Sequence, residues 1–125
     1  MPLNYTAALV TIAAPNFDLL VDFYKALLTQ APTVYTANVY AEFQLRGIKL
    51  GIYRPKAHDE LSPQPSALSP SISLCLEVVN LEAAIAYLTE LGYPPPGEIL
   101  TASHGREIYA YDPDGNRLIL HQGFK

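Results

Sequence analysis

The chain has 125 residues, of which 50% are hydrophobic and 16% charged, so it can bury a core and is unlike a disordered protein. Its net charge of -4 provides no basic surface for nucleic acid or for an anionic membrane. The single cysteine excludes an internal disulfide, and the chain has neither a basic leader nor an apolar run of ~18 residues, so we expect a cytoplasmic protein.

The first half of the chain predicts a strand, a helix and three further strands. Residues 9–14 are prone to form a strand that Pro15 ends, and Asn16 is then a candidate helix cap. Apolar residues recur at helical spacing across residues 17–28. The three further strands are predicted at residues 33–36, 39–46 and 48–54, and a proline-rich linker at residues 55–70.

The same pattern then starts again. A strand is predicted at residues 72–78, followed by a cap at Asn80 and a helix that ends at Gly92. Setting Asn80 over Asn16 aligns the apolar stripes of the two helices. Three more strands are predicted at residues 97–101, 106–111 and 117–122. The chain therefore predicts an α+β fold made of two βαβββ repeats, because internal repetition is a stronger signal than any single element.

Three local sequences add to the repeat: Phe23-Tyr24-Lys25 near the end of the first helix, residues 76–84, and the Asp-Pro-Asp-Gly-Asn turn at residues 112–116. Together they resemble the vicinal oxygen chelate superfamily of glyoxalases, bleomycin-resistance proteins and extradiol dioxygenases. The resemblance covers nearly the whole chain. It implies one domain across residues 1–125, with repeat one at 5–54 and repeat two at 71–123, whose mixed sheets form a cup. It also implies a homodimer.

Metal-dependent members of this superfamily hold a divalent ion with four side chains, and the ion acts as a Lewis acid on the substrate. Carrying those places over to this chain gives Leu9, Gly51, Ser73 and Ile119. Leucine, glycine and isoleucine have no side-chain donor, and a neutral serine is a weak ligand. We therefore expect no standard metal centre, no metal and no cofactor.

Strand alternation predicts which side chains line the cup, because every second residue faces away from the helices. A mixture of tyrosines, carboxylates and a few cations suits an organic ligand, cationic or aromatic. The tyrosines are equally suited to filling the cup or a subunit interface. The candidate ligand-binding residues are Tyr40, Glu42, Lys49, Tyr53, Glu77, Glu107, Tyr109, Tyr111, Arg117 and His121.

Two of these residues have alternative roles. Glu77 is either a base in a partly dry cup or the ion-pair partner of Lys49 or Arg117. His121 is either a shifted metal ligand or general base, or a solvated histidine. We expect His104 and His58 to be loop histidines without function. Cys75 has apolar neighbours and is expected to be buried and inert, since a catalytic thiol needs a lowered pKa.

Three functions remain open. The leading hypothesis is a metal-free binding protein, similar to the bleomycin-resistance branch, that sequesters a small organic molecule. The second is a metal-dependent lyase or dioxygenase that uses shifted ligands, namely Glu42, Glu77, Glu107 and His121. The third is a structural or regulatory domain whose cup is filled by its own side chains.

Overall fold

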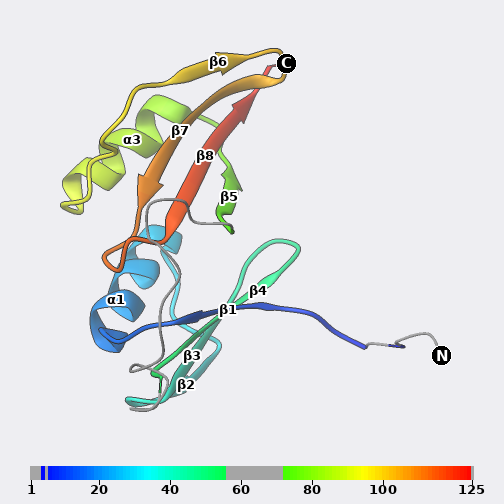
Figure 1. Ribbon diagram of the computed structural model, residues 1–125, viewed down its shortest axis with the longest axis vertical. Coiled ribbons are helices and arrows are strands. Elements are labelled where there is room, and N and C mark those ends of the chain that lie inside the picture. The colour runs from blue at the N-terminus through cyan, green and yellow to red at the C-terminus, as the bar shows by residue number, and fades with distance from the viewer. Residues whose placement is uncertain (1–3, 5, 56–71, 125) are drawn as a thin grey trace. The chain divides into compact units, whose positions relative to one another are not determined.

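The computed structural model describes residues 4, 6–55 and 72–124. The chain divides into two units, Met1–Pro63 and Gln64–Lys125. In its described part each unit consists of one four-stranded sheet and one helix (Figure 1). The predicted linker lies outside the described residues except for Pro55, and so does His58.

The first unit contains β1 (Val10–Ala13), α1 (Phe17–Leu28), β2 (Val34–Thr36), β3 (Tyr40–Gln44) and β4 (Lys49–Tyr53). Its strands lie in the order β1-β4-β3-β2. Strand β1 runs parallel to β4, and the other pairs are antiparallel. The parallel pair requires the chain to cross over between them, and α1 is part of that connection.

The second unit contains β5 (Leu74–Glu77), α3 (Leu81–Glu90), β6 (Leu100–Ala102), β7 (Gly105–Tyr111) and β8 (Arg117–Gly123). Its strand order, β5-β8-β7-β6, repeats that of the first unit, again with one parallel pair, β5 and β8. The predicted α+β fold with two βαβββ repeats is therefore confirmed.

One face of the first sheet is apolar and forms a core with α1. Phe17, Leu20 and Tyr24 on the helix are fully buried. The sheet contributes Phe43 and Leu50, which lie opposite each other in the β3–β4 register and are 0% and 1% exposed. Burying side chains of this size contributes about 1.5–3 kcal/mol each, so this face holds the unit together, and the polar side chains of β3 and β4 lie on the other face.

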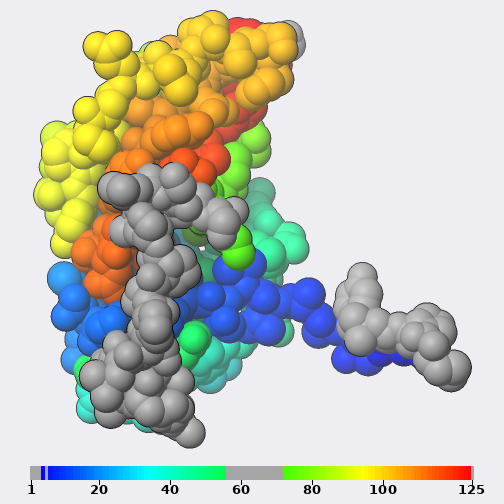
Figure 2. All heavy atoms as spheres, viewed as in Figure 1, coloured from blue at the N-terminus to red at the C-terminus, as the bar shows by residue number. Residues whose placement is uncertain are grey.

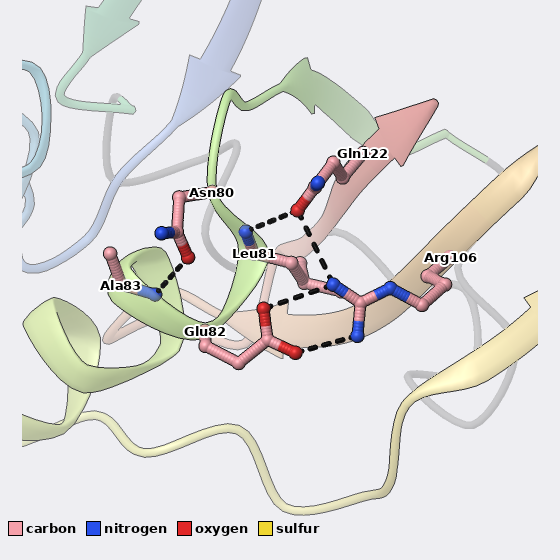
Figure 3. A network of polar contacts seen from close by, with 6 residues as sticks. All are labelled: Asn80, Leu81, Glu82, Ala83, Arg106 and Gln122. Atoms are coloured by element: carbon pink, nitrogen blue, oxygen red, sulfur yellow. Dashed lines mark hydrogen bonds and ion pairs between the residues drawn. The ribbon is translucent and has the colours of Figure 1, made fainter. Parts of the chain in front are cut away.

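In the second unit a network of polar contacts connects the start of α3 to β7 and β8 (Figure 3). The Ala83 amide donates to Asn80 Oδ1 at 2.9 Å, which confirms the predicted cap. The Leu81 amide donates to Gln122 Oε1 at 2.7 Å, and the Arg106 guanidinium contacts both oxygens of Glu82 at 2.6 and 2.9 Å. These residues occupy the helix-facing side of β7 and β8, so the opposite side carries the candidate site.

Two local predictions were wrong. Asn16 makes no side-chain capping bond, because its backbone (φ -98°, ψ 63°) is not in the extended conformation that Asn80 adopts (φ -139°, ψ 106°). The strand predicted at residues 72–78 begins only at Leu74, and Ile72 before it is 75% exposed.

The predicted turn between β7 and β8 is organised by one buried carboxylate. Asp112 is only 4% exposed and accepts hydrogen bonds from the Asp114 amide at 3.0 Å, the Asn116 amide at 2.9 Å and Asn116 Nδ2 at 2.8 Å. Gly115 has a φ of +85°, which glycine adopts without strain. The turn sets the β7–β8 register on which the second polar face depends.

Candidate functional site

The face of the first sheet that points away from its core gathers the predicted polar residues. The β3–β4 register places Tyr40 opposite Tyr53, Glu42 opposite Gly51, and Gln44 opposite Lys49. Gly51, one of the places where a metal ligand was expected to be missing, makes room for a neighbour. A Cβ atom there would lie 2.6 Å from the Tyr40 hydroxyl oxygen, so a larger residue would displace that ring.

Tyr40 and Glu42 form a fixed pair on this face. The Tyr40 hydroxyl donates to Glu42 Oε1 at 2.7 Å. Burial, this hydrogen bond and the negative charge of Glu42 raise the pKa of Tyr40 to about 12. The phenol therefore stays protonated at neutral pH and holds one oxygen of the carboxylate in place.

Beside Glu42 the surface is hollowed into an open depression of about 330 Å³. One part of its lining is apolar and the other is polar, since Glu42, Gln44 and Lys49 supply charged and amide groups. Part of the apolar wall comes from the exposed segment before β1, which belongs to the blue N-terminal part of the chain in Figure 2. The lining residues are Ala7, Ala8, Leu9, Glu42, Gln44, Gly47, Ile48 and Lys49.

The charged groups in the depression are unequally exposed. The Glu42 side chain is 17% exposed and the Lys49 side chain 50%. Lys49 Nζ lies 3.9 Å from Glu42 Oε2, which is an ion-pair distance but too long for a hydrogen bond. The depression therefore presents a largely buried, oriented carboxylate beside a half-exposed lysine.

The polar face of the second sheet carries a different cluster, centred on His121. His121 Nδ1 lies 2.8 Å from Glu77 Oε1 and 2.9 Å from Glu77 Oε2. On the other side of the ring, His121 Nε2 lies 2.9 Å from His104 Nδ1. Glu107 is the direct β7 partner of His121, and one ligand atom from each of His104, Glu107 and His121 lies within 4.8 Å of the others.

Three sequence predictions are corrected by this cluster. Glu77 pairs with His121 and not with Arg117 of the same strand, because β5 and β8 are neighbours and Glu77 lies opposite His121. His104 contacts His121 and is not an isolated loop histidine. Cys75 is exposed and not buried, and burial of part of its thiol, with Glu77 and Glu107 nearby, raises its pKa. A raised pKa disfavours the nucleophilic thiolate, as expected.

Arg117 joins two other predicted residues on the second sheet. Its Nε donates to the Ser73 hydroxyl at 2.7 Å, and its guanidinium lies 4.9 Å from the centre of the Tyr109 ring. Tyr111 lies opposite Arg117 in the β7–β8 register. Ser73, the third place of the standard metal centre, is thus bonded to a cation, which makes it still less suited to bind a metal ion.

Sequence reasoning missed His104, whose position before β7 carries no motif. The only available signal was Gly105, since a glycine at the start of a paired strand can mark a close approach of two backbones. None of the described helices is long and apolar enough to cross a lipid bilayer.

Comparison with known proteins gives a relative in sequence and several solved structures with the same fold. No protein-family model matches the chain. The chain is 29% identical over 116 residues to the metallothiol transferase FosB of Shouchella clausii, a match covering 91% of this chain and 77% of FosB.

Solved structures with the same fold include three named proteins. A glyoxalase/bleomycin resistance protein from Catenulispora acidiphila matches with a TM-score of 0.66, 22% identity, and 94% of this chain and 98% of that one covered. The fosfomycin resistance protein FosX of Listeria monocytogenes matches with a TM-score of 0.73, 16% identity, and 98% and 96% covered. A bleomycin resistance determinant encoded on transposon Tn5 matches with a TM-score of 0.67, 19% identity, and 97% and 100% covered. The resemblance is thus confirmed, and the chain has the fold of the vicinal oxygen chelate superfamily.

Proposed function

We propose that the chain is a small-molecule-binding protein that holds an organic ligand without the standard metal centre of the superfamily. The observation that carries this proposal is the depression of about 330 Å³ in the first unit, with an oriented carboxylate, Glu42, in its lining. Its volume falls in the range of about 300–1,000 Å³ that is typical of small-molecule sites. The replacement of the standard metal ligands by Leu9 and Gly51 in this unit supports binding without that centre.

The chemistry of the depression favours a ligand with an apolar body and an amine. Leu9 and Ile48 offer apolar surface, and both are exposed, 44% and 37%. Glu42 Oε1 is occupied by Tyr40, while Oε2 lies 3.9 Å from Lys49. A ligand ammonium would form a charge-assisted hydrogen bond of about 2.7–2.9 Å with Oε2, and the exposed Lys49 side chain would turn outward.

The named relatives support a small molecule as the ligand, without indicating an amine. Two of the matched structures are a fosfomycin resistance protein and a bleomycin resistance determinant, and both antibiotics are small molecules. We propose that this chain likewise sequesters a small molecule. Both antibiotics therefore belong in a ligand panel, next to aromatic amines and their neutral isosteres.

Thermal unfolding of the purified chain with this panel tests the proposal. A ligand that binds only the folded state adds about 2.7 kcal/mol of stability at about 100 times its Kd. We expect a shift in Tm with amines and a loss of that shift in Glu42→Gln. The matched control is Glu98→Gln, an exposed glutamate of the other unit. If no panel member shifts Tm, or if Glu42→Gln responds like the control, the proposal is wrong.

We also propose that residues 1–125 act as one domain of a cytoplasmic homodimer. Strand β6 ends its sheet and all of its residues are exposed, including Leu100 at 51%. Such an edge presents unpaired backbone groups and is a common site of association. Sedimentation equilibrium should give twice the chain mass of 13.7 kDa. A monomer at micromolar concentration would contradict the dimer without affecting the ligand site.

A further inference from the structure

We propose that His104, Glu107 and His121 bind one divalent transition-metal ion of the zinc type on the polar face of the second unit. Their ligand atoms already lie within 4.8 Å of one another. This site lies at places other than those of the standard centre, which in this unit are Ser73 and Ile119. The proposal does not depend on the ligand site of the first unit.

The separation of the two imidazoles suits a shared ion. Two nitrogens that bind zinc at about 2.0–2.1 Å with a tetrahedral angle lie about 3.3 Å apart. His104 Nδ1 and His121 Nε2 lie 2.9 Å apart, so a movement of a few tenths of an ångström accommodates the ion. His104 is exposed, so its side chain has room to adjust to the ion. The His121 side chain is only 12% exposed and stays in place.

Glu77 supplies the outer partner that metal-binding histidines usually have. Its carboxylate contacts His121 Nδ1 at 2.8 and 2.9 Å, and a carboxylate there accepts a hydrogen bond from an Nδ1–H group. In the tautomer that this contact favours, the lone pair of Nε2 points toward His104. This is the carboxylate–histidine arrangement that fixes the tautomer of a metal ligand and raises its basicity.

Gly105 positions His104 for this role. Its φ of +147° disfavours any other residue, and it pairs with Gly123 in the β7–β8 register. A Cβ atom at residue 105 would collide with the Gln122 carbonyl oxygen and would lie 3.0 Å from His121 Nε2. Because Gly105 has no side chain, His104 can approach His121 of the neighbouring strand β8.

The donor set indicates which ions bind. Two imidazoles and one carboxylate suit zinc, nickel, copper or iron, whereas magnesium and calcium prefer oxygen ligands alone. Three protein ligands leave a coordination position open to water or to a small molecule, as in catalytic rather than structural zinc sites.

Calorimetric titration of the untagged, metal-stripped chain with zinc chloride tests the site, with magnesium chloride as the comparison ion. We expect one zinc per chain and no magnesium binding. His104→Gln, His121→Asn and Glu107→Gln should each weaken zinc binding at least about tenfold, and Glu77→Gln about 10–100-fold. Glu98→Gln and Glu90→Gln, at two exposed glutamates of the same unit, serve as controls that should leave the affinity unchanged.

A second readout keeps the test valid if His121→Asn fails to fold. Long-range ¹H–¹⁵N spectra of the wild-type chain should show zinc-dependent shifts at His104 Nδ1 and His121 Nε2. Any of three results would overturn the proposal: no zinc binding at concentrations accessible to calorimetry, zinc binding unchanged in folded His104→Gln, or zinc-dependent shifts confined to His58, the third histidine of the chain.

Discussion

The Nδ1 atom of His104 lies 2.9 Å from the Nε2 atom of His121, although one residue precedes β7 and the other is in β8. At this distance one of the two nitrogens must donate a proton to the other, or both must share a bound cation. If both of these nitrogens carried a proton, two hydrogen-bond donors would face each other without an acceptor. The contact therefore joins an exposed residue before β7 to a residue of β8 whose side chain is largely buried.

Gly105→Ala tests whether this contact depends on a missing side chain. The substitution forces a positive φ on alanine and a clash with Gln122, so we expect it to cost about 1–3 kcal/mol of unfolding free energy. Zinc binding should weaken as well. Urea unfolding measures the first effect and calorimetry the second. The control is Gly97→Ala, where an added Cβ meets nothing within 4 Å. Equal stability of both variants would contradict the role of Gly105.

Alkaline titration tests the Tyr40–Glu42 pair. The pKa of Tyr40 is raised to about 12 in the folded chain, from 10.0, so the protonated phenol stabilises the fold fully below pH 10. That contribution is lost as the pH rises from 10 to 12. The difference in near-ultraviolet absorbance between wild type and Tyr40→Phe isolates the Tyr40 transition. Glu42→Gln should lower its midpoint while leaving it above 10, because burial remains. An unperturbed midpoint near 10 in the wild type would refute the pair.

Acid unfolding tests the ion pair between Arg106 and Glu82. The hydrogen bonds from Arg106 lower the pKa of Glu82 from 4.5 to about 2, so the pair stabilises the fold above pH 4.5. This stabilisation is lost as the pH falls from 4.5 to 2. Glu82→Gln should flatten the dependence of stability on pH in that window, and added salt should reduce the difference from wild type. Glu90→Gln, at the other end of α3, is the control; if it flattens the profile equally, the assignment fails.

Asp112→Ala tests the turn that sets the β7–β8 register. The substitution removes the acceptor of three hydrogen bonds at a residue only 4% exposed. We expect it to lower the unfolding free energy by about 2–3 kcal/mol. Asp112→Asn keeps an oxygen for the two backbone amides and should cost less. Chemical denaturation of both variants gives the comparison. Equal losses would show that the backbone hydrogen bonds to Oδ1 are not what holds the turn.

Much of the fold could be predicted because its signals are local or repeated. Asn80 could be recognised as a cap because it directly precedes a helical stripe of apolar residues. An asparagine there can accept a hydrogen bond from an amide of the first helical turn. The turn at residues 112–116 could be recognised because Gly115 follows Asp114, and this pair of residues favours the positive φ that a tight turn needs. The polar faces followed from alternation alone, and the structure confirms that Glu42 shares a sheet face with Lys49, its partner at 3.9 Å.

The failures came from non-local geometry. Asn16 has the same residue type as Asn80, but its backbone angles are set by the chain entering from β1, which a sequence pattern does not describe. The contact of His104 with His121 depends on the β7–β8 register and on the approach that Gly105 permits. Glu77 was expected to be a base or the partner of Lys49 or Arg117, because the sequence does not give the β5–β8 register that places it opposite His121.

The most direct test of the central claim, a ligand site in the depression of the first unit, is a ¹H–¹⁵N correlation spectrum of the labelled chain titrated with an aromatic amine. The account predicts saturable shifts at residues that line the depression, namely Ala8, Leu9, Gln44 and Lys49, and their loss in Glu42→Gln. Shifts confined to the second unit, or no saturable shifts with any amine tested, would contradict it.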